Sequence, residues 1–354
     1  MFGVWLSPVE HLVRDEGVGG SNPLTPTDCK GDARTSPFFY LLEIMEALLD
    51  IIIISFNTRD LTLRCIASVM ETCTLPHTIT VVDNNSSDGT VKAIKARYTD
   101  VNIIERTTNG GYAAAVNTGM AATSSEICLI TNADTRYFPK AIDELYNFMS
   151  VVPNAGTAGL QQVYPDGSWQ RSHGYYPGIK FGIYDILGIN KFINYRNAKA
   201  FNANKNQFVP KETEYIDGAI LMTRRTAFDE VGGFDEAFFF YAEETDYCFR
   251  LRKKGWKNML CPWIRSEHIR GASSNAFPHK ESVQLLVDGK IIFLKKHYGK
   301  FVLTFFTIME FIHFFSTEAI AKTARLFMPD TQFWNRKQEL YAKFLTAWKK
   351  NLYL

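Results

Sequence analysis

Short apolar runs alternate with segments of helical spacing from Asp50 onward. An apolar run of about four to eight residues is typical of a buried strand, and apolar positions three and four apart are typical of a helix. Strands that alternate with helices at this interval indicate an α/β fold with a mainly parallel, Rossmann-like sheet covered by helices on both faces. The predicted strands are 51–55, 78–83, 101–106 and 126–134, and the predicted helices are 61–72, 90–98, 111–123 and 139–152.

The pattern weakens in the middle of the chain and returns later. Residues 160–215 are rich in Tyr, Asn, Gly and Lys without a clear period, and we expect long loops there, which in a compact domain are usually functional or mobile. Strand character resumes at 215–225, and 227–236 is predicted to be a short helix that ends on glycines. A further strand is expected within 257–274.

After about residue 278 the chain is predicted to be helical. The run 301–316 is strongly apolar and is interrupted by Glu310 and His313. It is consistent with a core helix or a partner interface. It is also consistent with a helix lying in the plane of a membrane over 301–325, because basic residues flank it.

The first 44 residues do not follow this organisation. Residues 9–36 have no apolar period and are rich in Gly, Pro, Ser and Thr, which favours a disordered leader. The run "VEHLVRDEGVGGSNPLTPT" resembles the peptide that results when a tRNA gene is translated, and "GSNP" is what the tRNA T-arm consensus encodes. We therefore expect 1–44 to be disordered or artefactual, with Met45 as the natural start. The predicted domains are 45–277, catalytic, and 278–354, a C-terminal helical region.

Composition narrows the function classes only slightly. The chain has 354 residues, 46% of them apolar, and a formal net charge of +2, so nucleic acid is not expected as a partner. The six cysteines form no C-x-x-C pair and several lie in apolar runs, which favours buried thiols in a reducing compartment. No uninterrupted apolar stretch reaches the ~18 residues of a typical membrane span.

Ligands bind at the carboxyl ends of the strands in parallel sheets, so the residues at these ends are candidates by position. They are Ser55, Phe56 and Asn57 at the end of the first predicted strand, Asp83 at the end of the second and Asp134 at the end of the fourth. Asp83 and Asp134 also suit local turns or a helix N-cap. Carboxylates are oxygen ligands that Mg²⁺ uses together with substrate phosphates, so Asp134 is equally a candidate metal ligand.

Three acids in "YAEETDYCFR" lie beside aromatic residues. If a helix begins near Glu243, Asp246 and Arg250 are four residues apart and can pair on one face. Glu244 then points elsewhere, and a glutamate that neighbouring aromatic rings partly desolvate suits a general base. The geometry favours Glu244 over Asp246 as the base without excluding Asp246. A lone His268 after a strand is structural or exposed more often than it is a ligand.

The order of these motifs resembles that of inverting family 2 glycosyltransferases with the GT-A fold, over about residues 50–300. The rhamnosyltransferase-like and galactofuranosyltransferase-like members are the most similar. The motifs that carry the resemblance are "ISFN", "VVDNNSSDG", "NGGYAAAVNTGM", "TNADT", "YIDGAILMTRR", "EETD" and "HIRGAS".

The resemblance implies a role for each matching position. Glu244 is the implied catalytic base, at a position where the family more often has Asp, and Asp246 remains the second catalytic candidate. Asn132 replaces the first acid of the family's D-x-D motif, so metal binding rests mainly on Asp134, with His268 as the second ligand. The residues implied to lie on the nucleotide-sugar side are Ser55, Asn57, Asp83, Asn109, Gly110, Gly111, Asn117, Asn132, Asp217 and Gly218.

The resemblance also implies partners and a compartment. The donor is expected to be dTDP-rhamnose or a UDP-sugar, bound with Mg²⁺ or Mn²⁺, and the acceptor a glycan or lipid-linked glycan of a cell-surface polysaccharide. The expected location is the cytoplasm, including the inner face of the cell membrane, and the oligomeric state stays open. A nucleotidyltransferase would usually carry a glycine-rich loop after the first strand, which "SFNTRDLTLR" lacks. A non-catalytic sugar-nucleotide-binding protein need not keep Asp134, Glu244 and His268 together.

Overall fold

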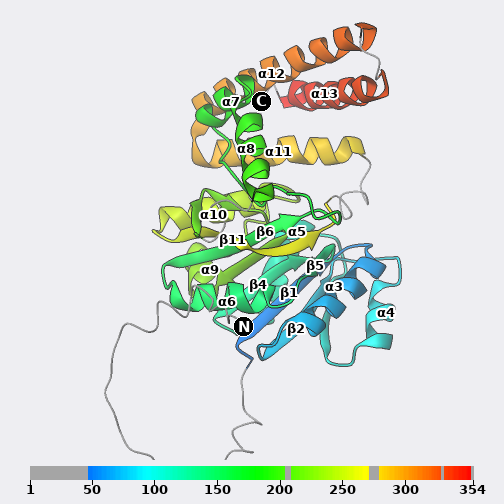
Figure 1. Ribbon diagram of the computed structural model, residues 1–354, viewed down its shortest axis with the longest axis vertical. Helices are drawn as coiled ribbons and strands as arrows, with labels where there is room; N and C mark the ends of the chain where they lie inside the picture. Colours follow the sequence, from blue (N-terminus) through cyan, green and yellow to red (C-terminus); the bar gives the residue numbers. More distant parts are fainter. Residues whose placement is uncertain (1–46, 204–208, 271–278, 328–330, 352–354) are drawn as a thin grey trace, which may run out of the picture.

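The computed structural model describes residues 47–203, 209–270, 279–327 and 331–351. Figure 1 shows a central sheet with helices on both faces and a separate layer of helices above it. The expected leader 1–44 lies outside the described residues. Gly271, Ala272 and Ser273 of "HIRGAS" also lie outside them.

The described residues form a nine-stranded mixed sheet. Four parallel strands make one half, β1 (Leu49–Ser55), β2 (His77–Asp83), β3 (Val101–Glu105) and β4 (Ile127–Asn132), in the order β3-β2-β1-β4. β10 (Ile220–Arg224) then pairs antiparallel with both β4 and β6 (Ala155–Val163). β11 (Lys257–His268) runs parallel to β6 and antiparallel to β5 (Thr135–Tyr137) and β8 (Lys211–Thr213).

Apolar side chains of the sheet pack against helices on each face. One core includes α3 (Arg59–Thr72), α4 (Thr90–Arg97) and α6 (Ala141–Val151). The other includes α5 (Gly111–Ala121), α9 (Arg225–Val231) and α10 (Glu243–Lys253). The predicted two-sided α/β arrangement is confirmed, and the five described cysteines, all free and buried, agree with the prediction of buried thiols.

The prediction of long loops over 160–215 is wrong. β6 continues to Val163, β7 (His173–Gly174) pairs with β9 (Tyr215–Ile216), and two helices follow β7, α7 (Ile179–Ile186) and α8 (Ile189–Asn202). The sequence pattern does not show these helices because polar residues are interspersed with Tyr and Phe, of which Phe181 packs against the C-terminal helices while Phe192 and Tyr195 are exposed. Gly182 of α7 also lies against Phe306 and Met309 of α12.

The C-terminal region is helical, as predicted. α11 (His279–His297), α12 (Gly299–Phe327) and α13 (Thr331–Asn351) share a third apolar core that includes Phe306, Phe314 and Trp348. One face of α12 therefore packs in this core. Phe301, Ile308 and Phe315 of the same helix are exposed. Among the described residues, one helical stretch, Gly299–Thr323, is long and apolar enough to cross a membrane by length and composition.

The loop before α10 has an unusual backbone and is held from two sides. Tyr241 and Ala242 are consecutive non-glycine residues with φ values of 72° and 71°. Such conformations cost about 1–3 kcal/mol each and persist only where the surroundings enforce them. A β-carbon on Gly111 would lie 2.2 Å from the Phe239 carbonyl oxygen, and one on Gly289 of α11 would lie 2.4 Å from the Tyr241 carbonyl oxygen. Two glycines thus let α5 and α11 close on this loop.

We expect Gly289→Ala to destabilise the protein by about 1–3 kcal/mol, because the added methyl group overlaps backbone atoms of the strained loop. Replacing a glycine inside a helix by alanine is ordinarily stabilising by up to about 1 kcal/mol. Gly182→Ala is the matched control, since its β-carbon would meet Met309 at 3.4 Å, an ordinary contact. Chemical unfolding of both variants measures the difference, and an equal effect of the two substitutions would contradict this account of the loop.

Candidate active site

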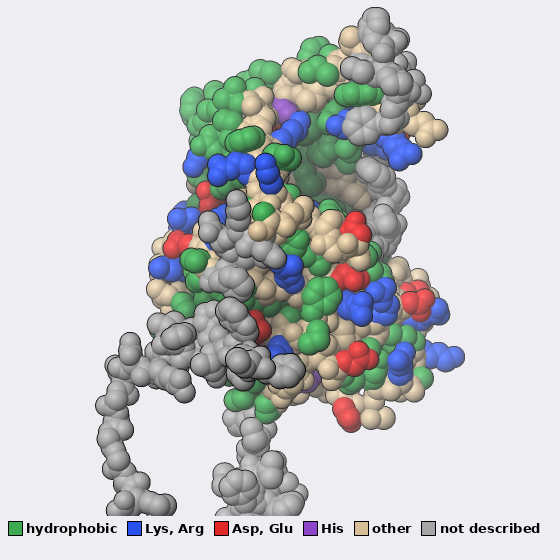
Figure 2. Space-filling view, viewed as in Figure 1, with side chains coloured by type: hydrophobic (Ala, Val, Ile, Leu, Met, Phe, Trp, Pro, Cys, Tyr) green, Lys and Arg blue, Asp and Glu red, His purple; other side chains and the backbone are tan. Residues whose placement is uncertain are grey.

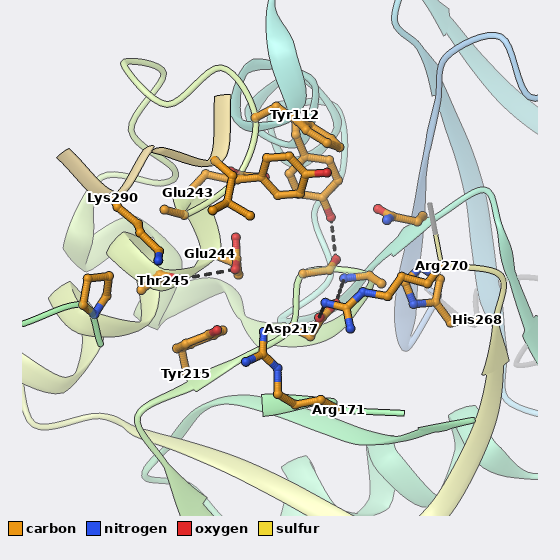
Figure 3. A pocket seen from close by; sticks show the side chains of 18 of the residues that line it. Tyr112, Arg171, Tyr215, Asp217, Glu243, Glu244, Thr245, His268, Arg270 and Lys290 are labelled. Carbon is orange, nitrogen blue, oxygen red and sulfur yellow. Dashed lines mark hydrogen bonds and ion pairs between the residues drawn. The ribbon is translucent and has the colours of Figure 1, made fainter. Parts of the chain in front are cut away.

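A cavity of about 420 Å³ opens beyond the carboxyl end of β4, between the sheet and the C-terminal helices. Six of the residues predicted from the sequence line it. They come from four separate parts of the chain and are Asn132, Asp134, Asp217, Gly218, Glu244 and His268. Figure 3 shows Asp217 and Glu244 pointing into the same space, with His268 and Arg270 on one side and Lys290 on the other.

Asp134 and His268 lie side by side in the cavity wall. The two residues are 3% and 5% exposed, and Nε2 of His268 is 3.4 Å from Oδ1 of Asp134. Nδ1 of His268 lies 2.8 Å from Oε1 of Gln162 and 2.7 Å from Oε1 of Gln170. Because both of these partners are amide oxygens, Nδ1 must be the protonated nitrogen. In the neutral ring, Nε2 then presents a lone pair to a carboxylate oxygen that has no hydrogen-bond partner.

Two acceptor atoms in this arrangement require a cation or a proton between them. Imidazole nitrogen and carboxylate oxygen are both ligands of divalent metals, and the amides of Gln162 and Gln170 fix the ring as outer partners of metal-bound histidines do. Within the described residues, no cluster of three His, Cys, Asp or Glu side chains that could hold a metal is found. The two residues therefore fit a metal only if a ligand supplies further oxygens, as a diphosphate does.

Glu244 is half-buried in the cavity wall, at the second position of α10. Thr245 donates a hydrogen bond of 3.2 Å to its Oε1. Burial, together with the negative charge of Asp217, raises the pKa of Glu244 to about 7. A carboxylate with this pKa can accept a proton near neutral pH. Its neighbour Glu243 is 5% exposed, and burial and the Glu244 charge raise the pKa of that carboxyl well above its usual value.

Asp217 remains an anion beside Glu244. Burial acts to raise its pKa, but the positive charge of Arg270 and a hydrogen bond from the Ala219 amide help to hold the pKa below the usual value. Its Oδ2 is 3.9 Å from Nη2 of Arg270. One acid with a raised pKa and one with a lowered pKa thus share a cavity, which is the arrangement that separates acid–base roles in active sites.

Asp246, the second catalytic candidate, points away from this cavity. It is fully buried, and its carboxylate contacts two cations, Arg250 at 2.6 Å and Lys296 at 2.8 Å, and the His297 ring at 2.7 Å. The predicted pair with Arg250 is therefore confirmed. Burial acts to raise the pKa of Asp246, while the hydrogen bonds from His297, Lys296 and Arg250 lower it to about 2. In this position Asp246 links α10 to the end of α11.

The residues predicted for the nucleotide side occupy the neighbouring strand ends. Asn109 and Gly111 line a narrow cavity of about 40 Å³ that shares Asn132 and Tyr112 with the larger one. Gly110 precedes α5, with the Arg106 guanidinium packed against it. Asn57 lines a separate, shallow cavity and accepts a hydrogen bond from the Ser87 amide.

Three further predicted residues lie outside these cavities. Asp83 is 3% exposed, and its Oδ2 accepts a hydrogen bond from the Ser86 amide while Oδ1 has no partner. The Ser55 hydroxyl is hydrogen-bonded to Thr62 of α3. Asn117 donates hydrogen bonds to the Phe234 carbonyl and to Glu236, so it fastens α5 to the 234–236 segment.

Several residues of the cavity were not predicted. Tyr112 donates a 2.6 Å hydrogen bond to the Gly218 carbonyl and joins α5 to the strand end at the cavity. Arg171 lies in the segment that the sequence pattern assigned to loops, and Lys290 belongs to α11, beyond the predicted catalytic region. The position of Arg270 within "HIRGAS" is a sequence signal that could have identified it. No local pattern singles out Lys290.

Comparison with known proteins identifies the family of this chain and several of its relatives. The family described as Glycosyl transferase family 2 matches residues 50–232. An N-acetylglucosaminyl-diphospho-decaprenol L-rhamnosyltransferase of Mycobacterium tuberculosis is 29% identical over 265 residues, which cover 69% of this chain and 85% of the relative. The rhamnosyltransferase WbbL of Escherichia coli is 30% identical over 76 residues, 20% of this chain and 29% of the relative.

A solved structure supports the fold assignment. The mannosyltransferase of Pyrobaculum calidifontis in complex with GDP-Man and Mn²⁺ superposes with a TM-score of 0.54 at 17% identity, covering 87% of this chain and 88% of that one. The expected GT-A fold, with a mostly parallel sheet and additional C-terminal helices, is confirmed.

We expect Asp246→Ala to lower the free energy of unfolding by about 3–5 kcal/mol at neutral pH, because the largely buried Arg250 loses its carboxylate partner and the buried His297 ring loses its hydrogen bond. Asp235→Ala is the control. Asp235 binds the same Lys296 but its side chain is 31% exposed, so a loss of about 0–1 kcal/mol is expected.

The contribution of Asp246 should also depend on pH. Its folded pKa of about 2 lies below the ordinary value of 3.8, so its stabilisation is complete above the ordinary value and disappears as the pH falls through 2. Denaturant titrations of wild type and Asp246→Ala between pH 7 and pH 2 should converge at the acid end. Curves that stay equally far apart would argue against an ionised Asp246 in the fold.

Proposed function

The chain belongs to glycosyl transferase family 2, and we propose that it transfers a sugar from a nucleoside-diphosphate sugar to a hydroxyl of a glycan or lipid-linked glycan, with inversion at the anomeric carbon. The observation that carries this proposal is the shared cavity of Asp134, His268 and Glu244. It combines a site for a cation and diphosphate with a carboxylate of suitable pKa for accepting a proton.

The donor is proposed to be dTDP-rhamnose or a UDP-sugar. The rhamnosyltransferases of M. tuberculosis and E. coli named above favour rhamnose. Asp83 supports a nucleotide donor, because its Oδ1 is buried at a strand end without a hydrogen-bond partner. An acid there can accept hydrogen bonds from a base or ribose. Asn57, Asn109, Gly110 and Gly111 would line the path from this end to Asn132.

Asp134 and His268 are proposed to hold a divalent metal, Mg²⁺ or Mn²⁺, together with the donor diphosphate. When bound, the metal neutralises charge on the leaving nucleoside diphosphate. Arg270 lies on the same side of the cavity and adds a permanent positive charge. Asn132 can contribute a neutral amide but not the charge that an acid at this position would add.

Glu244 is proposed to take the proton from the acceptor hydroxyl as that oxygen attacks the anomeric carbon. The bond from the anomeric carbon to the diphosphate oxygen breaks as the new glycosidic bond forms, and its electron pair leaves with the diphosphate. A single displacement from the opposite face inverts the configuration. A β-carbon on Gly218 would lie 3.4 Å from the β-carbon of Glu244, so a side chain at this position would narrow the space before the base.

We propose that the chain divides at residue 277 into a catalytic region and a helical region, as predicted. Lys290 of α11 lines the catalytic cavity, so the helical region contributes to the site. We propose a cytoplasmic enzyme of cell-surface polysaccharide biosynthesis, in which the exposed apolar residues within 301–325 contact the inner face of the membrane.

We expect Glu244→Gln to lower turnover by the ~10²–10⁴-fold typical of a lost general base while donor binding is kept. In the wild type, turnover should rise as the pH rises through about 7, because Glu244 is ionised above that pKa. Glu243→Gln is the comparison. Its carboxyl has a pKa well above the usual value, so a neutral amide resembles its normal state and the loss should be smaller.

These effects can be measured by the release of nucleoside diphosphate in the presence of acceptor, across pH 5–9. A Glu244→Gln enzyme with near-normal turnover would refute the assignment of the base.

We expect Asp134→Ala to remove the part of nucleotide affinity that depends on metal. Calorimetric titration with UDP and dTDP, each with Mn²⁺ and with EDTA, separates this part from the contribution of the protein alone. Asp143→Ala is the control, since that acid is bonded to Thr74 on the α6 side of the sheet. If Mn²⁺ strengthens nucleotide binding equally in wild type and Asp134→Ala, Asp134 does not hold the metal.

A further inference from the structure

Another cavity, of about 310 Å³, lies next to the catalytic one, between α7, α8 and the beginning of α12, and is named the second cavity. Tyr175 and Phe181 line both cavities, so the two meet at these rings. Its volume is at the lower end of the roughly 300–1,000 Å³ typical of small-molecule sites. No step of sugar transfer described above uses this second cavity.

The walls of the second cavity are mainly aromatic and aliphatic. Tyr184, Tyr298 and Val302 complete the set that begins with Tyr175 and Phe181. Its polar wall groups are largely engaged with the protein. Glu214 accepts a hydrogen bond from the Tyr176 amide, and the Asn190 amide nitrogen donates to Asp185, which leaves Oδ1 of Asn190 as a buried atom without a partner. An occupant would therefore be bound mainly through apolar surface.

Cations lie on both sides of the junction between the cavities. On the catalytic side, Lys290 lies with its Nζ 5.5 Å from the centre of the Phe181 ring. One of its three donors is used by Glu310, which leaves two. On the other side, Lys180 lines the second cavity.

Arg171 adds a third positive charge within the catalytic cavity. Among the described residues, its guanidinium has no hydrogen bond or ion pair. Arg171 interacts with the charges of Asp217 and Glu244, so the cations at the junction itself are Lys290 and Lys180, whose charge favours a phosphate or diphosphate there.

The outer surface of the same helices is apolar and basic. Leu187, Phe192 and Phe301 are 66%, 59% and 76% exposed, and Lys191 and Arg196 lie among them. Figure 2 shows hydrophobic side chains gathered over α7 and the adjoining part of α12, with Lys and Arg beside them. Apolar and basic residues together suit the surface of an anionic membrane, from which an apolar chain could enter.

We propose that the second cavity binds the apolar chain of a lipid-linked acceptor, whose phosphate groups lie at the junction near Lys290 and Lys180. The acceptor sugar then occupies the catalytic cavity with its hydroxyl at Glu244. This assignment rests on the proposed function, since it places the parts of one acceptor in order: sugar, phosphate, apolar chain.

Binding of farnesyl diphosphate and of inorganic pyrophosphate to the full chain tests this proposal, by calorimetry in EDTA so that no metal bridges the diphosphate. Farnesyl diphosphate should bind roughly tenfold or more tightly than pyrophosphate, because its chain leaves water. Val302→Trp, which fills the second cavity, should remove this difference and leave pyrophosphate affinity unchanged. Ile308→Trp is the control, on the same helix but 47% exposed and outside the cavity lining.

A second pair of variants avoids filling the cavity. Lys180→Ala should weaken farnesyl diphosphate binding by about three- to tenfold, whereas Lys191→Ala, an exposed lysine outside the lining, should not. Thermal melting of each variant checks that it is folded. Equal affinity of the wild type for farnesyl diphosphate and pyrophosphate, or an undiminished preference in folded Val302→Trp, would overturn the proposal.

The outcome is separable from that of the proposed function. Titration of the same preparations with UDP- and dTDP-sugars in Mn²⁺ reports on the donor site. Donor binding without a preference for the farnesyl chain rejects the lipid cavity alone. Farnesyl preference without any donor binding rejects glycosyl transfer as proposed, while the cavity assignment stands as a site for an apolar phosphate ester.

Discussion

The buried carboxylate of Asp246 is the contact on which the arrangement of this site depends. It lies two residues after Glu244, on the opposite side of the first turn of α10, and its partners Lys296 and His297 end α11. Arg250 continues the network to the carbonyl groups of Val231 and Gly233. A charge removed from water is tolerated only when such partners surround it. The position of α10, and with it the direction of Glu244, is therefore tied to the C-terminal helices as well as to the sheet.

Packing of α5 and α11 against the loop before α10 explains why strained backbone is retained beside the cavity. The segment Phe239–Ala242 enters α10 through two left-handed residues, and it is enclosed by α5 through Gly111 and by α11 through Gly289. The Tyr112 amide donates a hydrogen bond to the Phe239 carbonyl, and the Tyr112 hydroxyl donates one to the Gly218 carbonyl. Strain of this kind is found where neighbouring elements over-determine the chain. Here it orients the start of α10 so that Glu244 faces Asp217 while Asp246 faces the interior.

The sequence pattern was informative wherever the chemistry is local. The strand ending in Asp83, the helix that begins at Gly111, and the i, i+4 pair of Asp246 and Arg250 were all predictable from spacing, and the strand predicted over 126–134 exists but ends at Asn132. Motif order led to the correct family. The pattern failed for α7 and α8, whose apolar residues pack on other helices or remain exposed, so they do not show the one-sided period of a helix on a sheet. Lys290 and Arg171 could not be predicted because they reach the cavity only through tertiary packing, and a lysine or arginine in isolation is most often a surface residue.

The link between Asp246 and the end of α11 has a consequence for biosynthesis of the protein. His297 follows Asp246 by 51 residues, so on the ribosome the carboxylate is made well before Lys296 and His297. Domains generally fold as they emerge from the N-terminus, and the sheet can form first. Of these three partners, Asp246 then has Arg250 alone until α11 has left the exit tunnel. The active centre is thus among the last parts of the fold to become ordered, and a nascent chain that stalls before α11 holds its substrate-binding strands without a fixed base.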